Sequence, residues 1–343
     1  MKEYEASIAG IAHHDYPVVL LFALLKVDEV ETYEITQEML YNYGWETVFY
    51  KYEVENKIQH IPKQIDAVYL SVVEKKFYSI ECMLPVDKLC KLFQQKNFKT
   101  GTVLLKKIII GFAPFGGIAL WLGSKDKTTL VSWMKGTDVY VNIQDFFPTN
   151  KSLDSFCKSH MAYNIKCMKQ KKVENTSKLL FDGFMKQFTY RYVLDIEHKN
   201  VNRNIKLNAK EIVFDYIEEA LFDGTHDKLH DGDLLKYHQA GKPKKLAIKW
   251  HIGNSEYFAY FWFDDERIRE VFDKFYGAHP DTKTDFIIRI DAENRKYELA
   301  LYRYGLKEPQ VIPENVYQLL VFKNKFEDYR SDNYNQERGA WIW

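Results

Sequence analysis

Short runs of apolar and β-branched residues, separated by polar turns, predict that much of the chain folds as β-hairpins. Residues 67–73 and 77–83 are two such runs, separated by three charged residues. Residues 247–252 and 257–263 repeat the arrangement around a four-residue turn that contains a glycine. Because two strand-like runs joined by a short polar turn are typical of a hairpin, each pair predicts two adjacent antiparallel strands.

Helical spacing and capping signals predict two kinds of helix. The segments 28–44 and 208–224 each begin with Asp or Asn three residues before a Glu, and each ends on a glycine. The first feature is a capping box, and the glycine suits the left-handed position after the last helical turn. In the second segment, apolar residues recur at helical spacing from Ile212 to Leu221. We therefore expect a longer helix in each of these segments, and a shorter helix at 86–93 and at 265–272.

The predicted elements recur at a nearly constant spacing along the chain. Pro62 and Phe77 align with Pro243 and Phe258, in both cases 181 residues later, and the two longer helices start 180 residues apart. Such self-similarity indicates two tandem related modules. Since hairpins alternate with inserted helices and no βαβ pattern occurs, we expect an α+β fold, in which each module has a mainly antiparallel sheet with one longer and one short helix.

This spacing also predicts the domain organisation. Residues 1–150 form the first α+β module, residues 151–184 a connecting helical segment, and residues 185–343 a second, diverged α+β module. Because no low-complexity linker separates the modules, we expect them to pack against one another.

Composition excludes several classes of protein. The chain of 343 residues is 46% hydrophobic and 16% aromatic, which is far more core-forming material than a disordered protein carries. Its 48 Lys and Arg residues balance 48 Asp and Glu residues, so it lacks the basic excess of a nucleic-acid binder. The cysteines form no CxxC pair, which argues against a disulfide scaffold or a zinc ribbon. They are Cys82, Cys90, Cys157 and Cys167.

The hydrophobic pattern also bears on membranes and export. The uncharged run Ile108–Leu122 has 15 residues, fewer than the roughly 20 that a spanning helix needs. The first residues carry acids where an export signal has a basic end followed by an apolar stretch. We therefore expect no membrane span, no lipid-acceptor cysteine and a cytoplasmic location.

Motifs of known catalytic chemistry are not found in the sequence. Gly111, Gly116 and Gly117 form neither GxGxxG nor a P-loop, and a second strand follows them where a phosphate site needs a helix. A hairpin turn explains these glycines. No GxSxG motif surrounds a serine. The sequence therefore predicts a non-enzymatic protein, with no catalytic residues and no cofactor.

Two histidines are the best candidate for metal binding. His226 and His230 are four residues apart, a spacing that directs both rings at one ion when they lie on a helix. Gly224 and Gly232 flank them, and the glutamate of HExxH is missing. We expect a solvated polar loop and no metal, and whether this loop binds an ion stays open.

The charge is uneven along the second half of the chain. Residues 211–233 contain eight acidic residues and one lysine. This pattern fits either the solvated face of a helix or a docking surface for a basic protein, where complementary charge speeds association and fixes orientation. The candidate partner-binding residues are Glu211, Asp215, Glu218, Glu219, Asp223, Asp227, Asp231 and Asp233.

Three stretches carry a resemblance to a known family. They are an aromatic-Ser strand with an acidic-Lys-Phe-Tyr turn at 67–78, a Leu-Pro helix start at 84–93, and a glycine hairpin ending in Trp at 110–122. Together they resemble the bacterial family catalogued as domain of unknown function 2931, over roughly residues 4–145. The second half keeps only the skeleton of these motifs.

The resemblance implies binding more than catalysis. Many members of that family are envelope lipoproteins, and relatives occur beside type VI secretion toxin loci in the Bacteroides group, where small non-enzymatic proteins neutralise toxins. No catalytic residues are implied.

Three hypotheses of function follow. The first is a non-enzymatic protein-binding module, an immunity protein that neutralises a type VI or other contact-dependent secreted toxin, with a basic protein as its partner. The alternative is a ligand-binding protein or hydrolase with a site between the two modules. The second alternative is a structural envelope or assembly component. The oligomeric state and the exposed face of each sheet are left open.

Overall fold

The computed structural model divides the chain into two compact units, Met1–Gly183 (unit 1) and Phe184–Trp343 (unit 2), which are described here one at a time. The structure describes residues 6–13, 16–35, 45, 57–95, 105–124, 127–149, 152–164, 178–196, 212–252, 255–291 and 296–323. The predicted connecting segment 151–184 contains two helices, α4 (Leu153–Asn164) and most of α6 (Lys178–Met185).

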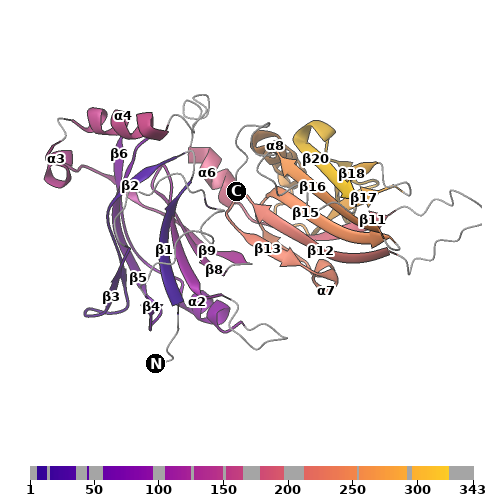
Figure 1. Cartoon of the computed structure of the whole chain (residues 1–343), viewed down its shortest axis with the longest axis horizontal. Helices are drawn as coiled ribbons and strands as arrows, with labels where there is room; N and C mark the ends of the chain where they lie inside the picture. The colour runs from indigo at the N-terminus through magenta and orange to yellow at the C-terminus, as the bar shows by residue number, and fades with distance from the viewer. Residues whose placement is uncertain are drawn as a thin grey trace, which may run out of the picture. The chain divides into compact units, whose positions relative to one another are not determined.

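Unit 1 is built from two β-sheets (Figure 1, indigo to magenta). In spatial order, the strands of the first sheet are β9 (Thr128–Lys135), β8 (Gly117–Gly123), β7 (Lys107–Phe112), β1 (Ala6–Ala12) and β4 (Lys57–Ile58). Those of the second sheet are β10 (Thr137–Val139), β6 (Lys76–Met83), β5 (Gln64–Ser71), β2 (Val18–Lys26) and β3 (Thr32–Glu34). The helices are α2 (Val86–Phe93), α3 (Ile143–Phe146) and α4.

One hydrophobic core joins the two sheets of unit 1. Ile110 and Leu120 of the first sheet and Leu20 and Tyr69 of the second are all buried in it, together with Leu89 of α2. Alternate residues of each strand therefore point into the same interior, which is the arrangement of a β-sandwich.

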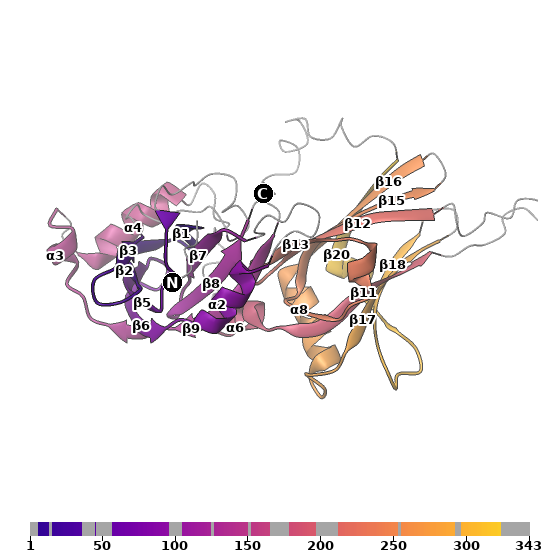
Figure 2. The same ribbon diagram turned by 90° about the horizontal axis from the view of Figure 1, so that it is seen from below.

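Unit 2 has the same construction (Figure 2, orange to yellow). In spatial order, the strands of its first sheet are β19 (Gln310–Val311), β18 (Tyr297–Arg303), β17 (Thr284–Ile290), β11 (Phe188–Ile196) and β14 (His238–Ala240). Those of its second sheet are β20 (Tyr317–Lys323), β16 (Ser255–Phe263), β15 (Pro243–Ile252), β12 (Ile212–Leu221) and β13 (His226–Leu229). The helices are α7 (Asp231–Leu234), α8 (Asp265–Tyr276) and the 3₁₀-helix η2 (Glu314–Val316).

The two units share one strand order. Each strand of unit 2 occupies the sheet position of the unit 1 strand whose label is ten lower. Each unit also has a parallel pair at the same place, β1 with β7 and β11 with β17, and a helix after the matching hairpin. Tandem related modules predict such a shared order, and the descent of both units from one module stays a hypothesis.

The predicted hairpins and short helices are confirmed. β5 pairs with β6 and β15 pairs with β16, both antiparallel, and each hairpin is followed by the expected short helix, α2 or α8. In α8, the Asp264 carboxylate accepts a hydrogen bond from the amide of Arg267, which caps the first turn.

The predicted α+β class is wrong, because the described residues form a mainly β protein with twenty strands and six α-helices. The expected helix at 208–224 is the strand β12 in its described part, and the described part of 28–44 contains β3. Gly44 and the second capping box, Asn208 with Glu211, lie outside the described residues. The two described signals, Asp28 and Gly224, belong to turns. The Asp28 carboxylate accepts from the amides of Val30 and Glu31, and Gly224 has a φ of 81° between β12 and β13.

The glycines of the β7–β8 hairpin have two tasks. Gly116 takes a φ of 74° in the turn, which a glycine adopts without strain. A Cβ on Gly111 would lie 2.3 Å from the Trp121 ring, and one on Gly117 would lie 2.2 Å from the Trp133 ring. Two of the three glycines therefore make room for tryptophan rings, which a turn alone does not explain.

Among the described helices, none is long and apolar enough to cross a membrane.

Candidate functional site

The eight acidic candidates do not form one face. Three of them, Asp215, Glu218 and Glu219, lie on β12, which is a strand and not a helix, so successive side chains point to opposite sides of the sheet. Two are buried inside unit 2, two are half-buried on the outer side of β12, three lie on β13 and α7, and one is outside the described residues. The buried pair is Glu219 and Asp223, and the half-buried pair on β12 is Asp215 and Glu218. Asp227 lies on β13, Asp231 and Asp233 lie in α7, and Glu211 is outside the described residues.

The two buried carboxylates belong to a polar network inside unit 2. The hydroxyl of Tyr192 donates to Glu219 Oε2 at 2.6 Å, and His238 Nε2 lies 3.7 Å from Glu219 Oε1. Asp223 accepts from the amide of Thr225 at 2.8 Å, and burial raises the pKa of its carboxyl group. Both carboxylates are at most 2% exposed, so a partner protein cannot contact them on this surface.

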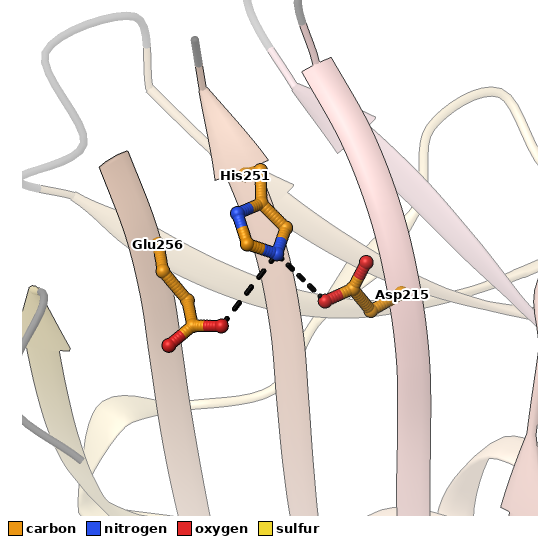
Figure 3. A group of neighbouring side chains, drawn as sticks. All are labelled: Asp215, His251 and Glu256. Atoms are coloured by element: carbon orange, nitrogen blue, oxygen red, sulfur yellow. Dashed lines mark hydrogen bonds and ion pairs between the residues drawn. The ribbon is translucent and has the colours of Figure 1, made fainter. Parts of the chain in front are cut away.

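A second group of charges lies on the outer side of the sheet that contains β12, β15 and β16 (Figure 3). His251 Nε2 is 2.8 Å from Asp215 Oδ2 and 3.6 Å from Glu256 Oε1. Lys249, two residues before His251 on β15, forms an ion pair with Glu256 and has its ammonium 3.6 Å from Asp215 Oδ2. We call Asp215, Lys249, His251 and Glu256 the carboxylate–histidine cluster.

The carboxylate–histidine cluster contains the ligand types of a divalent metal. One ligand atom each of Asp215, His251 and Glu256 lies within 4.8 Å of the others. The Lys249 ammonium already supplies positive charge to both carboxylates. Burial lowers the pKa of Lys249, but the hydrogen bond to Glu256 and the charges of both carboxylates outweigh burial and raise it. An incoming metal ion would have to displace this ammonium, so the arrangement favours a closed ion-pair network.

Sequence reasoning missed three members of this cluster, Lys249, His251 and Glu256. Pairing in the β15–β16 hairpin places His251 directly opposite Glu256, and β12 brings Asp215 alongside. The predicted turn at 253–256 contains Glu256, whereas β16 begins at Ser255, so the predicted register does not place His251 opposite Glu256. The pairing of β12 with β15 could not be found while β12 was expected to be a helix.

His226 and His230 do not converge on one point. Both lie outside a helix, with His226 on β13 and His230 at the N-cap of α7. His226 Nε2 is 3.2 Å from Glu218 Oε1, whereas His230 Nδ1 is 3.1 Å from the backbone oxygen of Asp215. The spacing of four residues therefore does not direct both rings at one metal ion. The segment that was expected to be a solvated loop is partly the strand β13.

The remaining acidic candidates lie within eight residues of an exposed leucine that follows α7. Asp231 and Asp233 are exposed, and Asp227 on β13 is half-buried. Leu235 is 73% exposed and follows Asp231 by four residues, which places both side chains on the same side of the short helical turn. We call Asp227, Asp231, Asp233 and Leu235 the acidic corner.

Unit 2 also contains a cleft of about 830 Å³. Tyr297 of β18 and Tyr317 and Leu319 of β20 line it, together with the ion pair of Arg289 and Glu298. Tyr317 packs edge-on against Phe261 at 5.6 Å between ring centroids, so its ring is held by the core of unit 2. The volume lies within the range of small-molecule sites in proteins.

Comparisons with known proteins leave the activity open. The family described as "Protein of unknown function (DUF2931)" matches residues 3–192, which cover unit 1 and the start of unit 2. No curated protein and no solved structure matches the chain.

Proposed function

The chain belongs to the DUF2931 family, whose function is unknown, and we propose that it is a non-enzymatic protein-binding module that recognises a basic partner through the acidic corner. The observation that carries this proposal is Leu235, a large apolar side chain that is 73% exposed in the segment that contains Asp227, Asp231 and Asp233. In protein interfaces an exposed apolar anchor supplies affinity, and charged residues near it supply orientation.

The charges of the acidic corner suit a basic surface. Asp231 and Asp233 sit in the first turn of α7, and the carboxylate of Asp233 is 3.4 Å from Lys236, its nearest cation among the described residues. A partner with lysines or arginines around an apolar pocket would pair with these carboxylates while the pocket receives Leu235. Such pairs speed association and are weakened by salt.

The partner we propose is a basic, contact-dependent secreted toxin, which makes the chain its immunity protein. Two points support this choice. The charge of the acidic corner calls for a basic protein, and the family resemblance points to small proteins that neutralise toxins. The balance of 48 cationic and 48 anionic residues in the whole chain shows that the acidic charge is local.

Co-expression with a candidate toxin gene taken from the neighbourhood of its own gene tests the proposal. We expect the full chain to restore growth and to co-purify with the toxin. Asp231→Lys and Leu235→Ala should each weaken binding by about tenfold or more, because an interface anchor or a charge pair is lost. The matched control is Tyr304→Ala, which removes a 99% exposed ring elsewhere in unit 2 and should bind normally. Full rescue by the Asp231→Lys variant would reject the acidic corner as the site.

Ligand binding is a second candidate function, favoured by the cleft of about 830 Å³. Tyrosine rings beside carboxylates and a guanidinium suit a polar ligand with flat apolar faces, such as a sugar. Thermal shift measurements with mono- and oligosaccharides should then show stabilisation that Tyr297→Ala abolishes. No stabilisation by any of them would count against this candidate.

A further inference from the structure

The strand β20 forms one edge of its sheet and is unusually apolar. Its sequence, Tyr317–Lys323, contains one charged residue and no proline. Among the described strands, β16 is its only neighbour, so alternate backbone N–H and C=O groups of β20 point away from the sheet. None of its seven residues is buried. An edge of this kind is a template for pairing with another strand.

The matching strand of unit 1 shows how such an edge is normally protected. β10 holds the same place in its sheet, yet it has only three residues, two of them exposed. Asp138 at its centre forms an ion pair with Lys76 at 2.8 Å. A short, charged edge strand resists pairing with other chains. Among the described strands, this edge is therefore short and charged in unit 1 but long and apolar in unit 2.

The cleft adds side-chain recognition to the backbone edge of β20. Tyr317 and Leu319, on the inner side of β20, line the cleft. A strand added to β20 would place its own inner-side residues next to Tyr317 and Leu319, which line this cleft. Backbone hydrogen bonds and alternate side chains would then both contribute, as in other cases of strand addition.

We infer that β20 pairs antiparallel with β20 of a second copy of the chain, which joins two unit 2 sheets into one continuous sheet. The sequence of β20 is self-complementary when the two-fold axis passes through Leu320. Leu320 then faces Leu320 of the second copy, Leu319 faces Val321, and Lys323 faces Tyr317 rather than another lysine. No like charges meet, and the chain has no net charge that would keep two copies apart.

This inference does not depend on the acidic corner, because β20 and α7 are different surfaces of unit 2. Strand pairing over seven residues, about 23 Å long, is a small interface. We therefore expect a weak dimer with a dissociation constant on the order of 10 µM.

Analytical ultracentrifugation of the full chain, from about 1 to about 300 µM, measures this directly. We expect a reversible monomer–dimer equilibrium. Leu320→Lys and Leu320→Glu should each raise the dissociation constant by about tenfold, since each places like charges opposite one another at the two-fold axis. An equimolar mixture of the two variants should form a heterodimer at least as readily as the natural chain. This complementation is specific to the register through Leu320.

The control is Val213→Lys, which adds the same charge at a 53% exposed apolar residue of β12 in the same sheet and should dimerise normally. Circular dichroism of each variant checks that it is folded. A chain that stays monomeric at about 300 µM overturns the inference, whether residues 324–343, a foreign protein or water then covers the edge. Failure of the two Leu320 variants to complement each other, when both are folded and the natural chain dimerises, also overturns it.

Discussion

Single residues of this chain are constrained by their packing partners. Trp121 and Trp133 of unit 1 lie against Gly111 and Gly117 in positions where no side chain would fit. Trp121 is 1% exposed, and its ring packs edge-on against Trp45 at 5.2 Å between centroids. The glycines of this hairpin are therefore part of the tryptophan packing, and not only of the turn.

We expect Gly111→Ala to lower the free energy of unfolding by about 1–3 kcal/mol, because the added methyl group forces the Trp121 ring to move in a packed interior. Urea denaturation followed by tryptophan fluorescence measures this. Gly232→Ala is the control, since a Cβ there meets no atom within 4 Å. Equal stability of both variants would show that the Trp121 ring does not fill this space.

At the scale of elements, the hairpins and short helices could be predicted from the sequence, whereas β12 could not. Ile217 and Leu221 of β12 are four residues apart, which also fits one face of a helix. In the strand they are buried because every second residue points inward, and Glu219 is the inward residue between them. A glutamate at an inward position interrupts the apolar–polar alternation that predicts a strand, so the sequence fits helical spacing better. Its partner, the hydroxyl of Tyr192, comes from β11, which no local pattern of β12 could reveal.

The outer side of β15 also contains a buried charge that the sequence does not show. Lys245 is only 8% exposed, and its ammonium lies 4.9 Å from the centroid of the Tyr260 ring. Burial lowers the pKa of Lys245 to about 7, while the charge of Glu218 raises it by a smaller amount. At low pH, the buried charged ammonium of Lys245 therefore lowers the stability of the folded state.

The sign of the effect follows from linkage. In the unfolded chain the lysine keeps its ordinary pKa of 10.5, so the folded state binds the proton less tightly. The cost of the buried charge is fully present below pH about 7 and disappears as the pH rises toward about 10.5. Lys245→Met should raise the free energy of unfolding by about 1–3 kcal/mol near pH 6, and this gain should shrink near pH 10.

Chemical denaturation at several pH values measures this gain. Lys236→Met is the matched control, because the side chain of Lys236 is 74% exposed and carries no burial cost. If Lys245→Met raises the free energy of unfolding by the same amount at every pH, the natural Lys245 does not carry a buried positive charge.

At the scale of the whole molecule, one strand order is used twice and the two copies differ in what they expose. Unit 1 has a short, charged edge at β10, whereas unit 2 has the long, apolar edge of β20 and the acidic corner. The sequence indicated the repeat through its spacing of about 180 residues. It could not show which acidic side chains are exposed, because the burial of Glu219 and Asp223 depends on how unit 2 packs around them.

Hydrogen–deuterium exchange of the full chain with and without the basic toxin tests the central proposal most directly. The account predicts slower exchange at residues 226–237, which carry the acidic corner, when the toxin is bound. Unchanged exchange at 226–237, with protection confined to other described parts of the chain, would contradict it.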